Sequence, residues 1–386
     1  MSSTHFDIAI LGAGAAGLHL ALAIKKESFF TNKRVLLIDK SAKDQNDRTW
    51  CFWEKGDGLW EDIVNHSWSH GHFYTAKKSI PLTLAPYRYK MIKSIDFYRF
   101  AKDEIASSSI FEWVTDSILS VKQTTCFSIQ GEKSEYTADF VFDSRIPEEF
   151  ENTNDPYTRL LQHFKGWVIC TEEDTFDPEQ FTMMDFRLLQ PETTSFTYVL
   201  PLNKREALVE FTLFSESLLH DDDYDSKLKE YINDILKIKD YQIIEEEKGV
   251  IPMSDFPFEK YSTGKHIRIG TGGGWVKPTT GYSFKNCERN AKKIVENLKL
   301  SRNANHGLLS KKFRLYDTLF LDILKRKNYM GPALYETMYT KISVQKILSF
   351  LDDQTNFRED LSVMSKFRSS HFIYAFTKYI SRKWNT

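Results

Sequence analysis

The chain has 386 residues, of which 41% are hydrophobic and 14% aromatic, and its formal net charge is −1. This length holds one large core or about two to three subdomains. The balanced charge gives no case for nucleic acid as a partner. The aromatic excess suits either a site for a large apolar or polyene ligand or an aromatic core.

The first forty residues carry the strongest local pattern. The order is a short apolar strand, a GxGxxG turn, a helix without breakers and a second strand that ends in an acid. The segments are Phe6–Leu11, Gly12–Gly17, Leu18–Lys26 and Arg34–Ile38, followed by Asp39. This order is typical of a dinucleotide-binding fold, and Asp39 lies 22 residues after Gly17, where an acid binds ribose hydroxyls.

Each residue of the turn has a physical role in that interpretation. Gly12 permits the tight turn, Gly14 lets a pyrophosphate approach the backbone, and Gly17 lets the helix pack closely on the strand. Ala15 and Ala16 lie in the turn, and the N-terminus of the helix that follows has free N–H groups and a partial positive charge that attract phosphates. The alternative is a glycine-rich turn in an ordinary α/β unit.

Short β-like segments and one helix follow. A dense aromatic cluster lies at residues 48–53, residues 54–90 and 110–143 predict short strands, and Ile95–Ser107 has the spacing of an amphipathic helix. Residues 146–160 are polar and predict a loop that crosses to a second domain.

That second domain is expected from Gly166 to Glu259. Strands are predicted at Trp167–Cys170, Phe196–Leu200 and Ala207–Phe214, the last two joined as a hairpin. Asp221–Leu236 predicts a helix that is mostly solvated.

The chain then returns to the first domain. A strand at residues 267–269 enters a glycine cluster, and Phe284–Leu298 predicts a helix, so this is a second candidate phosphate- or flavin-binding helix start. Residues 307–386 predict helices with more Lys and Arg than Asp and Glu.

Three blocks together resemble the FAD-dependent lycopene cyclases of carotenoid synthesis. Asp47–Trp53 is similar to the family's DRTWCFW block, and Gly270–Ser283 to its GxxGGxVxPxTGYS block. Tyr198–Leu202 with Leu208–Thr212 is similar to the strand pair that carries the acidic motif, FLEET in plants. The resemblance runs from about residue 6 to 300, with weaker matches at residues 138–145 and 181–187.

The resemblance implies an α/β, Rossmann-like FAD-binding fold of the glutathione-reductase or hydroxylase type. An antiparallel-sheet substrate domain is inserted in it, and a helical region ends the chain. The expected boundaries are 1–50, 95–150 and 262–306 for the FAD-binding domain, 51–94 and 151–261 for the substrate domain, and 307–386 for the helical region. The residues expected to bind FAD are Gly12, Gly14, Ala15, Ala16, Gly17, Asp39, Arg48, Gly272, Gly273, Gly281 and Tyr282.

The activity implied is redox-neutral cyclisation of the ψ-ends of lycopene to β-rings, giving γ-carotene and then β-carotene. Glu210 is the expected acid–base residue, since a carboxyl on an apolar strand that faces the flavin is desolvated and its pKa rises. The alternative is a Glu210 that points to water. The chain departs from the plant motif at Phe211, where the plants have a second acid.

The rings of Trp50, Phe52 and Trp53 either face the substrate cation or form core, and Arg48 either touches FAD or braces the Trp50 loop. Reduced FAD would stabilise the cation or donate the proton, with NADPH as external reductant. Asp185 is expected to form a structural salt bridge or to assist deprotonation.

No metal site is expected. His66, His70 and His72 lack Asp, Glu or Cys at supporting spacing and predict exposed histidines. The cysteines are widely spaced and indicate reduced thiols in a cytoplasmic protein; they are Cys51, Cys126, Cys170 and Cys287. A strand close to the N-terminus predicts that there is no signal peptide.

The last helices, with aromatic and basic residues around Phe320–Lys327 and Phe372–Lys383, predict either peripheral attachment to a membrane surface that delivers lycopene or a soluble cap. Two other functions remain open. One is a monooxygenase or prenyl-chain reductase of the same fold, and the other is a flavin-binding interaction protein without catalysis.

Overall fold

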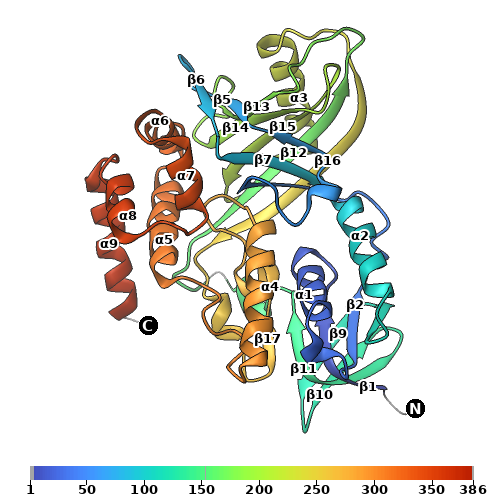
Figure 1. Ribbon diagram of the computed structural model, residues 1–386. Helices are drawn as coiled ribbons and strands as arrows, with labels where there is room; N and C mark the ends of the chain where they lie inside the picture. Colours follow the sequence, from blue (N-terminus) through green and yellow to red (C-terminus); the bar gives the residue numbers. More distant parts are fainter. Residues whose placement is uncertain (1–3, 153, 385–386) are drawn as a thin grey trace. The chain divides into compact units, whose positions relative to one another are not determined.

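The computed structural model describes residues 4–152 and 154–384, and the chain forms two compact units (Figure 1). Unit 1 comprises Met1–Trp50, Lys93–Asp155 and Phe256–Lys311. Unit 2 comprises Cys51–Ile92, Pro156–Asp255 and Lys312–Thr386. Each unit is therefore assembled from three separate stretches of the chain.

Unit 1 is built on a seven-stranded sheet of order β8-β2-β1-β11-β10-β9, with β17 pairing with β11. The strands β8, β2, β1, β11 and β17 are parallel, whereas β10 and β9 are antiparallel. The strands are β1 Thr4–Leu11, β2 Val35–Asp39, β8 Phe111–Thr115, β9 Ile118–Gln123, β10 Phe127–Gly131, β11 Glu135–Asp143 and β17 His266–Arg268. Every residue of β2 is buried, as expected for a strand inside a parallel sheet.

The helices of unit 1 are α1 Ala15–Lys25, α2 Ser94–Ala106 and α4 Phe284–Lys299. All three meet at the buried side chain of His19 on α1, whose ring contacts Phe97 of α2 and Phe284 of α4. Burial lowers the pKa of His19 to about 3, so this histidine is a neutral core residue. Short 3₁₀ turns lie at Ser28–Phe30, Glu148–Glu151, Phe258–Tyr261 and Gly270–Gly273.

Unit 2 contains a seven-stranded sheet of order β16-β12-β15-β14-β13-β5-β6 and a small sheet of order β3-β7-β4. All pairs in the large sheet are antiparallel except β13 with β5. The strands are β3 Thr49–Lys55, β4 His66–Trp68, β5 His70–Tyr74, β6 Ser79–Thr83, β7 Tyr87–Lys93, β12 Arg159–Cys170, β13 Gln180–Asp185, β14 Thr194–Pro201, β15 Glu206–Ser215 and β16 Gln242–Ser254.

One face of the large sheet packs on α3 (Asp221–Glu230) and the helical turn Tyr231–Ile235. Most residues of this segment are not buried, as expected for a mostly solvated helix, while Tyr224, Leu228 and Tyr231 are buried against alternate residues of β15. The long strand β16 was not predicted, since its acidic run has no apolar alternation.

The remaining helices of unit 2 are α5 Lys311–Arg326, α6 Gly331–Lys341, α7 Val344–Leu351, α8 Phe357–Met364 and α9 Ser369–Trp384, with short 3₁₀ turns at Glu61–Ile63 and Asn328–Met330. Leu319 and Ile323 on α5 form an apolar cluster with Ala375 on α9. The prediction that the C-terminal segment is helical is confirmed.

Candidate functional site

The glycine turn of unit 1 has the geometry that its sequence predicts. The chain leaves β1 at Gly12, whose φ of +104° is a left-handed conformation suited to glycine. A Cβ on Gly17 would lie 1.9 Å from the carbonyl oxygen of Gly12, so the helix can approach this turn only because residue 17 has no side chain.

Gly14 lies in a different environment. Within the described part of the chain, no heavy atom beyond its neighbours comes within 4 Å of the point where its Cβ would be. Gly14 is also the N-cap of α1, and no described side chain caps the helix there. The first turn of α1, with Ala15 and Ala16, therefore starts beside an open space, and the backbone N–H groups of a first helical turn are the donors that a phosphate requires.

Asp39 lies at the end of β2, next to the same turn. Its carboxylate accepts hydrogen bonds from the backbone N–H of Ala13 at 2.7 Å and of Ser41 at 2.9 Å, and Lys43 lies 3.4 Å away. Asp39 thus holds the glycine turn in place. A carboxylate has about four acceptor positions, so capacity is left for ribose hydroxyls.

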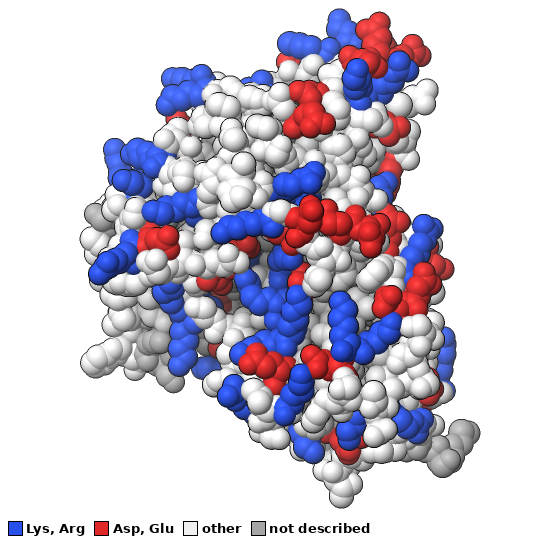
Figure 2. All heavy atoms as spheres, viewed as in Figure 1, with Lys and Arg blue, Asp and Glu red and all other residues white. Residues whose placement is uncertain are grey.

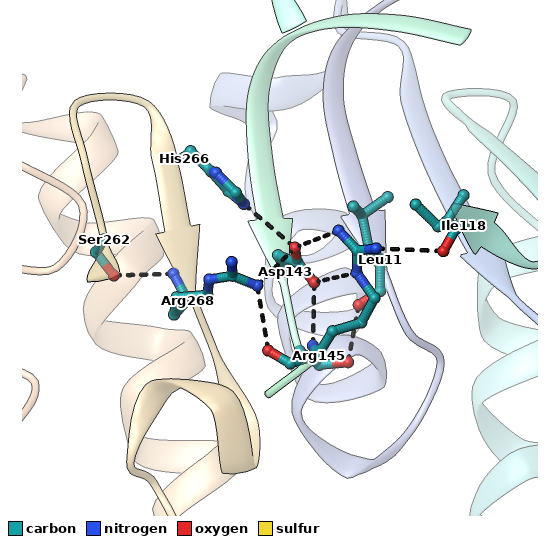
Figure 3. A network of polar contacts seen from close by, with 8 residues as sticks. Leu11, Ile118, Asp143, Arg145, Ser262, His266 and Arg268 are labelled. Carbon is teal, nitrogen blue, oxygen red and sulfur yellow. Dashed lines mark hydrogen bonds and ion pairs between the residues drawn. The ribbon is translucent and has the colours of Figure 1, made fainter. Parts of the chain in front are cut away.

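A polar network at the end of β11 supports the second glycine cluster (Figure 3). Buried Asp143 accepts from Arg145 and Arg268, both at 2.8 Å, and from His266 at 3.2 Å. Burial by itself would raise the pKa of Asp143, but these hydrogen bonds and positive charges hold it well below its usual range. The network fixes the chain between β11 and β17 beside the first glycine turn, where Ser144 bonds to the carbonyl of Leu11.

The glycines after β17 are explained by this packing. A Cβ on Gly272 would lie 2.1 Å from the carbonyl oxygen of Arg145, and one on Gly273 would lie 2.5 Å from that of Arg268. Gly270 has a φ of +58°, and a Cβ on this residue would lie 2.9 Å from Cβ of Ala16 on α1. The structure therefore brings the two predicted glycine segments together in unit 1.

Gly281 and Tyr282 form the tight turn before α4. Gly281 has a φ of +73°, and the backbone of residues 277–282 closes through bonds between Lys277 and both Gly281 and Tyr282. The helix α4 then starts at Phe284, two residues later than Tyr282.

Arg48 lies just before β3 and Trp50 is the second residue of β3, and both belong to unit 1. The guanidinium of Arg48 is exposed and lies 3.4 Å from the carboxylate of Asp47, while its backbone bonds to Ser94. Trp50 is half-buried and its ring contacts Phe97, Tyr98 and Phe284. The Trp50 ring is therefore held by aromatic packing, while the Arg48 side chain pairs with Asp47.

Glu210 lies on β15 of unit 2, on the face opposite the α3 core. Its cross-strand neighbours are Tyr198 on β14 and Gly166 on β12, and Gly166 is in turn paired with Glu247 on β16. Residues directly opposite in antiparallel strands share a face. The four residues therefore form one row, in which the glycine leaves room between the two glutamates.

Desolvation, followed by the charge of Glu247, raises the pKa of Glu210 well above its usual range. Thr212 acts in the opposite direction, since its hydroxyl donates to Oε1 of Glu210 at 2.6 Å. Glu210 nevertheless keeps some accessible surface. A raised pKa favours the protonated carboxyl, which is the form that a general acid requires.

Sequence reasoning did not find Glu247 or the position of Cys51. Burial, and then the nearby charges of Glu247 and Glu210, raise the pKa of the Cys51 thiol. Glu247 lies in an acidic run that resembles a solvated segment, and only the pairing of β16 with β12 brings it to Glu210.

Phe52 and Trp53 are each 3% exposed in unit 2. The indole N–H of Trp53 donates to the carbonyl oxygen of Leu348 on α7 at 3.2 Å. Between the two interpretations of these rings, this burial favours core.

Asp185 is fully buried in unit 2 and accepts from Arg187 and, at 2.6 Å, from the hydroxyl of Tyr231. This is a structural salt bridge with an added phenol. The nitrogens of His66 and His72 bond to Pro178 and Gln180 respectively. Within the described ranges, no group of three or more His, Cys, Asp or Glu is placed to hold a metal ion.

Charged side chains of both signs are interspersed on the face shown in Figure 2, as the net charge of −1 suggests. Among the helices of residues 4–152 and 154–384, none is long and apolar enough to cross a membrane.

Solved structures of other proteins share the fold of this chain. The chain matches a geranylgeranyl bacteriochlorophyll reductase-like protein from Thermoplasma acidophilum with a TM-score of 0.59 and 13% identity, covering 99% of this chain and 100% of the other. It matches the flavin-dependent brominase Bmp2 with a TM-score of 0.59 and 12% identity, covering 98% and 100%. The chain therefore has the α/β, Rossmann-type fold of flavin-dependent enzymes, with an inserted antiparallel sheet and a C-terminal helical region.

The family follows from the sequence comparison. The profile described as lycopene cyclase protein matches residues 7–377, so the chain belongs to this family.

Among curated relatives, a chloroplastic neoxanthin synthase of Solanum tuberosum is 23% identical over 308 residues, which are 72% of this chain and 57% of that protein. A chromoplastic capsanthin/capsorubin synthase of Capsicum annuum is 23% identical over 313 residues, which are 73% and 58%. The chain thus spans less than two thirds of the length of these plant relatives.

Proposed function

We propose that this protein is a lycopene β-cyclase, which converts the acyclic ψ-ends of lycopene to β-rings without net oxidation or reduction. Membership of the lycopene cyclase family supports the class of reaction. The observation that carries the proposal is Glu210, a half-buried residue at the family's acidic motif, because the pKa of its carboxyl is raised by desolvation and by Glu247. It is the acid that such a reaction requires.

The reaction is balanced by protons alone. The O–H bond of the Glu210 carboxyl breaks as a C–H bond forms at C2 of the ψ-end, which leaves a cation at C1. The electrons of the C5–C6 double bond then form the C1–C6 bond and leave the charge at C5. Loss of the C6 proton restores the double bond, so the product is an isomer of the substrate. The protein supplies the acid and base and keeps water from the cation.

The cofactor in this proposal is FAD, bound by unit 1. The open space over Gly14, the N–H groups at the start of α1 and the carboxylate of Asp39 fit its pyrophosphate and ribose. When bound and reduced, FAD supplies an electron-rich ring system that favours nearby positive charge. NADPH is proposed as the external reductant that keeps the FAD reduced. It is not consumed in each turnover, because the cyclisation itself makes no net redox change.

The test is expression in a host that accumulates lycopene, with the pigments separated by chromatography. We expect γ-carotene and β-carotene from the wild type and a loss of at least about 100-fold in Glu210→Gln, which removes the acid. Glu206→Gln is the matched control, since Glu206 lies on the same strand but bonds to Asn203 in the hairpin turn. Lycopene that stays linear with reduced flavin refutes the proposal, and one NADPH consumed per turnover indicates a reductase or monooxygenase.

We also propose that α9 attaches the cytoplasmic protein to the membrane surface that holds its substrate. Ile373, Phe376, Ile380 and Trp384 are between 39% and 87% exposed and recur at helical spacing on one side of α9. The opposite side packs on α5 through Ala375. A lipid surface is a suitable neighbour for an exposed apolar stripe, because it removes that stripe from water.

Flotation with anionic liposomes tests this attachment. The wild type should float, and a variant with Ile373→Ser, Phe376→Ser and Ile380→Ser should remain in the soluble fraction at low salt. Phe29→Ser is the control, since Phe29 is 53% exposed but lies in unit 1. Full recovery of the wild type in the soluble fraction would argue against a membrane surface.

A further inference from the structure

Two glutamates from separate strands share one place in unit 2. β12 lies between β15 and β16, and its residue Gly166 is paired with Glu210 on one side and with Glu247 on the other. The point where a Cβ of residue 166 would lie is 3.3 Å from Cβ of Glu210 and 3.2 Å from Cγ of Glu247. The absence of a side chain at Gly166 therefore leaves room for both glutamate side chains beside the intervening strand.

The pair favours retention of a proton. The charge of Glu247 raises the pKa of Glu210. Two carboxylates carry only acceptors, so a hydrogen bond between them forms only when one of the two groups is protonated. Like charges at this range disfavour double ionisation, as in other carboxyl pairs that share one proton.

We propose that Glu247 is a positioning residue that makes Glu210 hold one proton at neutral pH and recover it after each ring closure. The inference rests on the proposed function and deepens it, since the sequence motif supplied only one acid. When the pair gives its proton to C2, two adjacent carboxylates remain. Their mutual repulsion makes the pair basic, so it takes the C6 proton and returns to its starting state.

Three other titratable groups lie in the same part of unit 2 as Glu210 and Glu247. Tyr198 is opposite Glu210 on β14, Cys51 approaches from β3, and Glu245 lies two residues from Glu247 on the same face of β16. The interactions that shift the pKa of Glu210 are desolvation, Glu247 and the Thr212 hydroxyl, of which only Thr212 favours the ionised form. The proton is therefore retained mainly through burial and Glu247.

The pair also explains the departure at Phe211. Consecutive residues of a strand point to opposite faces, and Phe211 is buried in the α3 core on the face away from Glu210. An acid at residue 211 would lie inside that core in this protein. The second carboxyl comes instead from residue 247, which reaches the Glu210 face through strand pairing.

The test compares the pH dependence of cyclisation in wild type, Glu247→Gln and Glu246→Gln, with the full chain loaded with reduced FAD. Glutamine removes the neighbouring charge and can donate to Glu210, so the pKa of Glu210 falls. We expect the alkaline limb of the activity profile to move to lower pH by about one unit or more, a roughly tenfold loss on that limb. Glu246→Gln is the matched control, because Glu246 is exposed and pairs with Lys165 at 3.5 Å.

A second measurement separates this inference from the proposed function. The melting temperature of wild type should fall, relative to that of Glu247→Gln, as the pH rises from 5 to 8. The reason is that unfolding releases the proton that Glu247 helps the native protein to hold, and a higher pH favours that release. Glu247→Asp, which keeps the charge, should restore part of both effects.

An unchanged alkaline limb in Glu247→Gln, or an equal shift in Glu246→Gln, overturns the inference while lycopene cyclisation stands. A wild type that does not cyclise lycopene, but whose melting depends on pH as described, refutes the function and leaves the shared proton.

Discussion

Alanine at Gly14 separates cofactor binding from folding in unit 1. The backbone of Gly14 has a φ of −81° and a ψ of −169°, which alanine adopts without strain. Its Cβ would point into a space with no described protein atom within 4 Å. The folded protein therefore accommodates the methyl group, and only a ligand that occupies this space would meet it.

The expected magnitudes have opposite signs for the protein and for the complex. Replacing glycine by alanine at a compatible position stabilises a protein by about 0.4–1 kcal/mol, because the unfolded chain loses freedom. The same methyl group would displace a pyrophosphate that lies on the backbone, and we expect at least about a tenfold loss of FAD affinity, or about 1.4 kcal/mol. The variant should be slightly more stable without cofactor and bind the cofactor less tightly.

Gly17→Ala is the contrasting variant. Its Cβ would lie 1.9 Å from the carbonyl oxygen of Gly12 and 3.2 Å from Cγ2 of Ile10, so the helix must move away from the strand. Overpacking of this kind costs about 1–3 kcal/mol or more. We expect Gly17→Ala to lower the melting temperature with or without FAD.

The assay is thermal melting of flavin-free protein together with titration of FAD, followed by flavin fluorescence. Gly14→Ala should melt at or slightly above the wild-type temperature and show weakened binding. Wild-type affinity in Gly14→Ala would refute the assignment of this turn to the pyrophosphate. A large drop in its melting temperature would refute the open space over residue 14.

Three further predictions concern the carboxyls. Burial and Glu247 raise the pKa of Glu210 above the 4.5 of a free glutamate. The wild-type free energy of unfolding should therefore fall, relative to that of Glu210→Gln, by up to about 1.4 kcal/mol per pH unit as the pH rises from 4.5 through the raised pKa. The same pH dependence in both proteins, measured by urea unfolding, would contradict this. Gly166→Ala should cost about 1–3 kcal/mol and reduce cyclisation, since its Cβ would lie 3.2–3.3 Å from both glutamates; full activity in the pigment assay would argue against the pairing. Asp143→Asn leaves two arginines facing a neutral amide and should lower the free energy of unfolding by about 3 kcal/mol or more. In the wild type, the stability that Asp143 contributes should be lost only as the pH falls below 3.8 through the lowered pKa of its carboxyl. Unchanged stability in Asp143→Asn would show that the network of Figure 3 is dispensable.

Local sequence determined the nucleotide-type unit. The turn at Gly12, the helix after Gly14 and the strand that ends at Asp39 all depend on contacts among residues close in the chain. Each was predicted, although the helix begins at Ala15 instead of Leu18. The same holds for the helix after Tyr282. Glycine positions and hydrophobic periods carry this information, because φ preferences and strand or helix spacing act over a few residues.

Tertiary structure decided the rest of the acid site. Glu210 and Glu247 are 37 residues apart in the sequence, and neither strand reveals that a third strand, with glycine at residue 166, lies between them. The sequence by itself determined which carboxyl lies in the acidic motif. Only the pairing of β12 with both β15 and β16 decided that this carboxyl has a partner, because strand register and burial are set by contacts distant in the chain, and those contacts set its pKa.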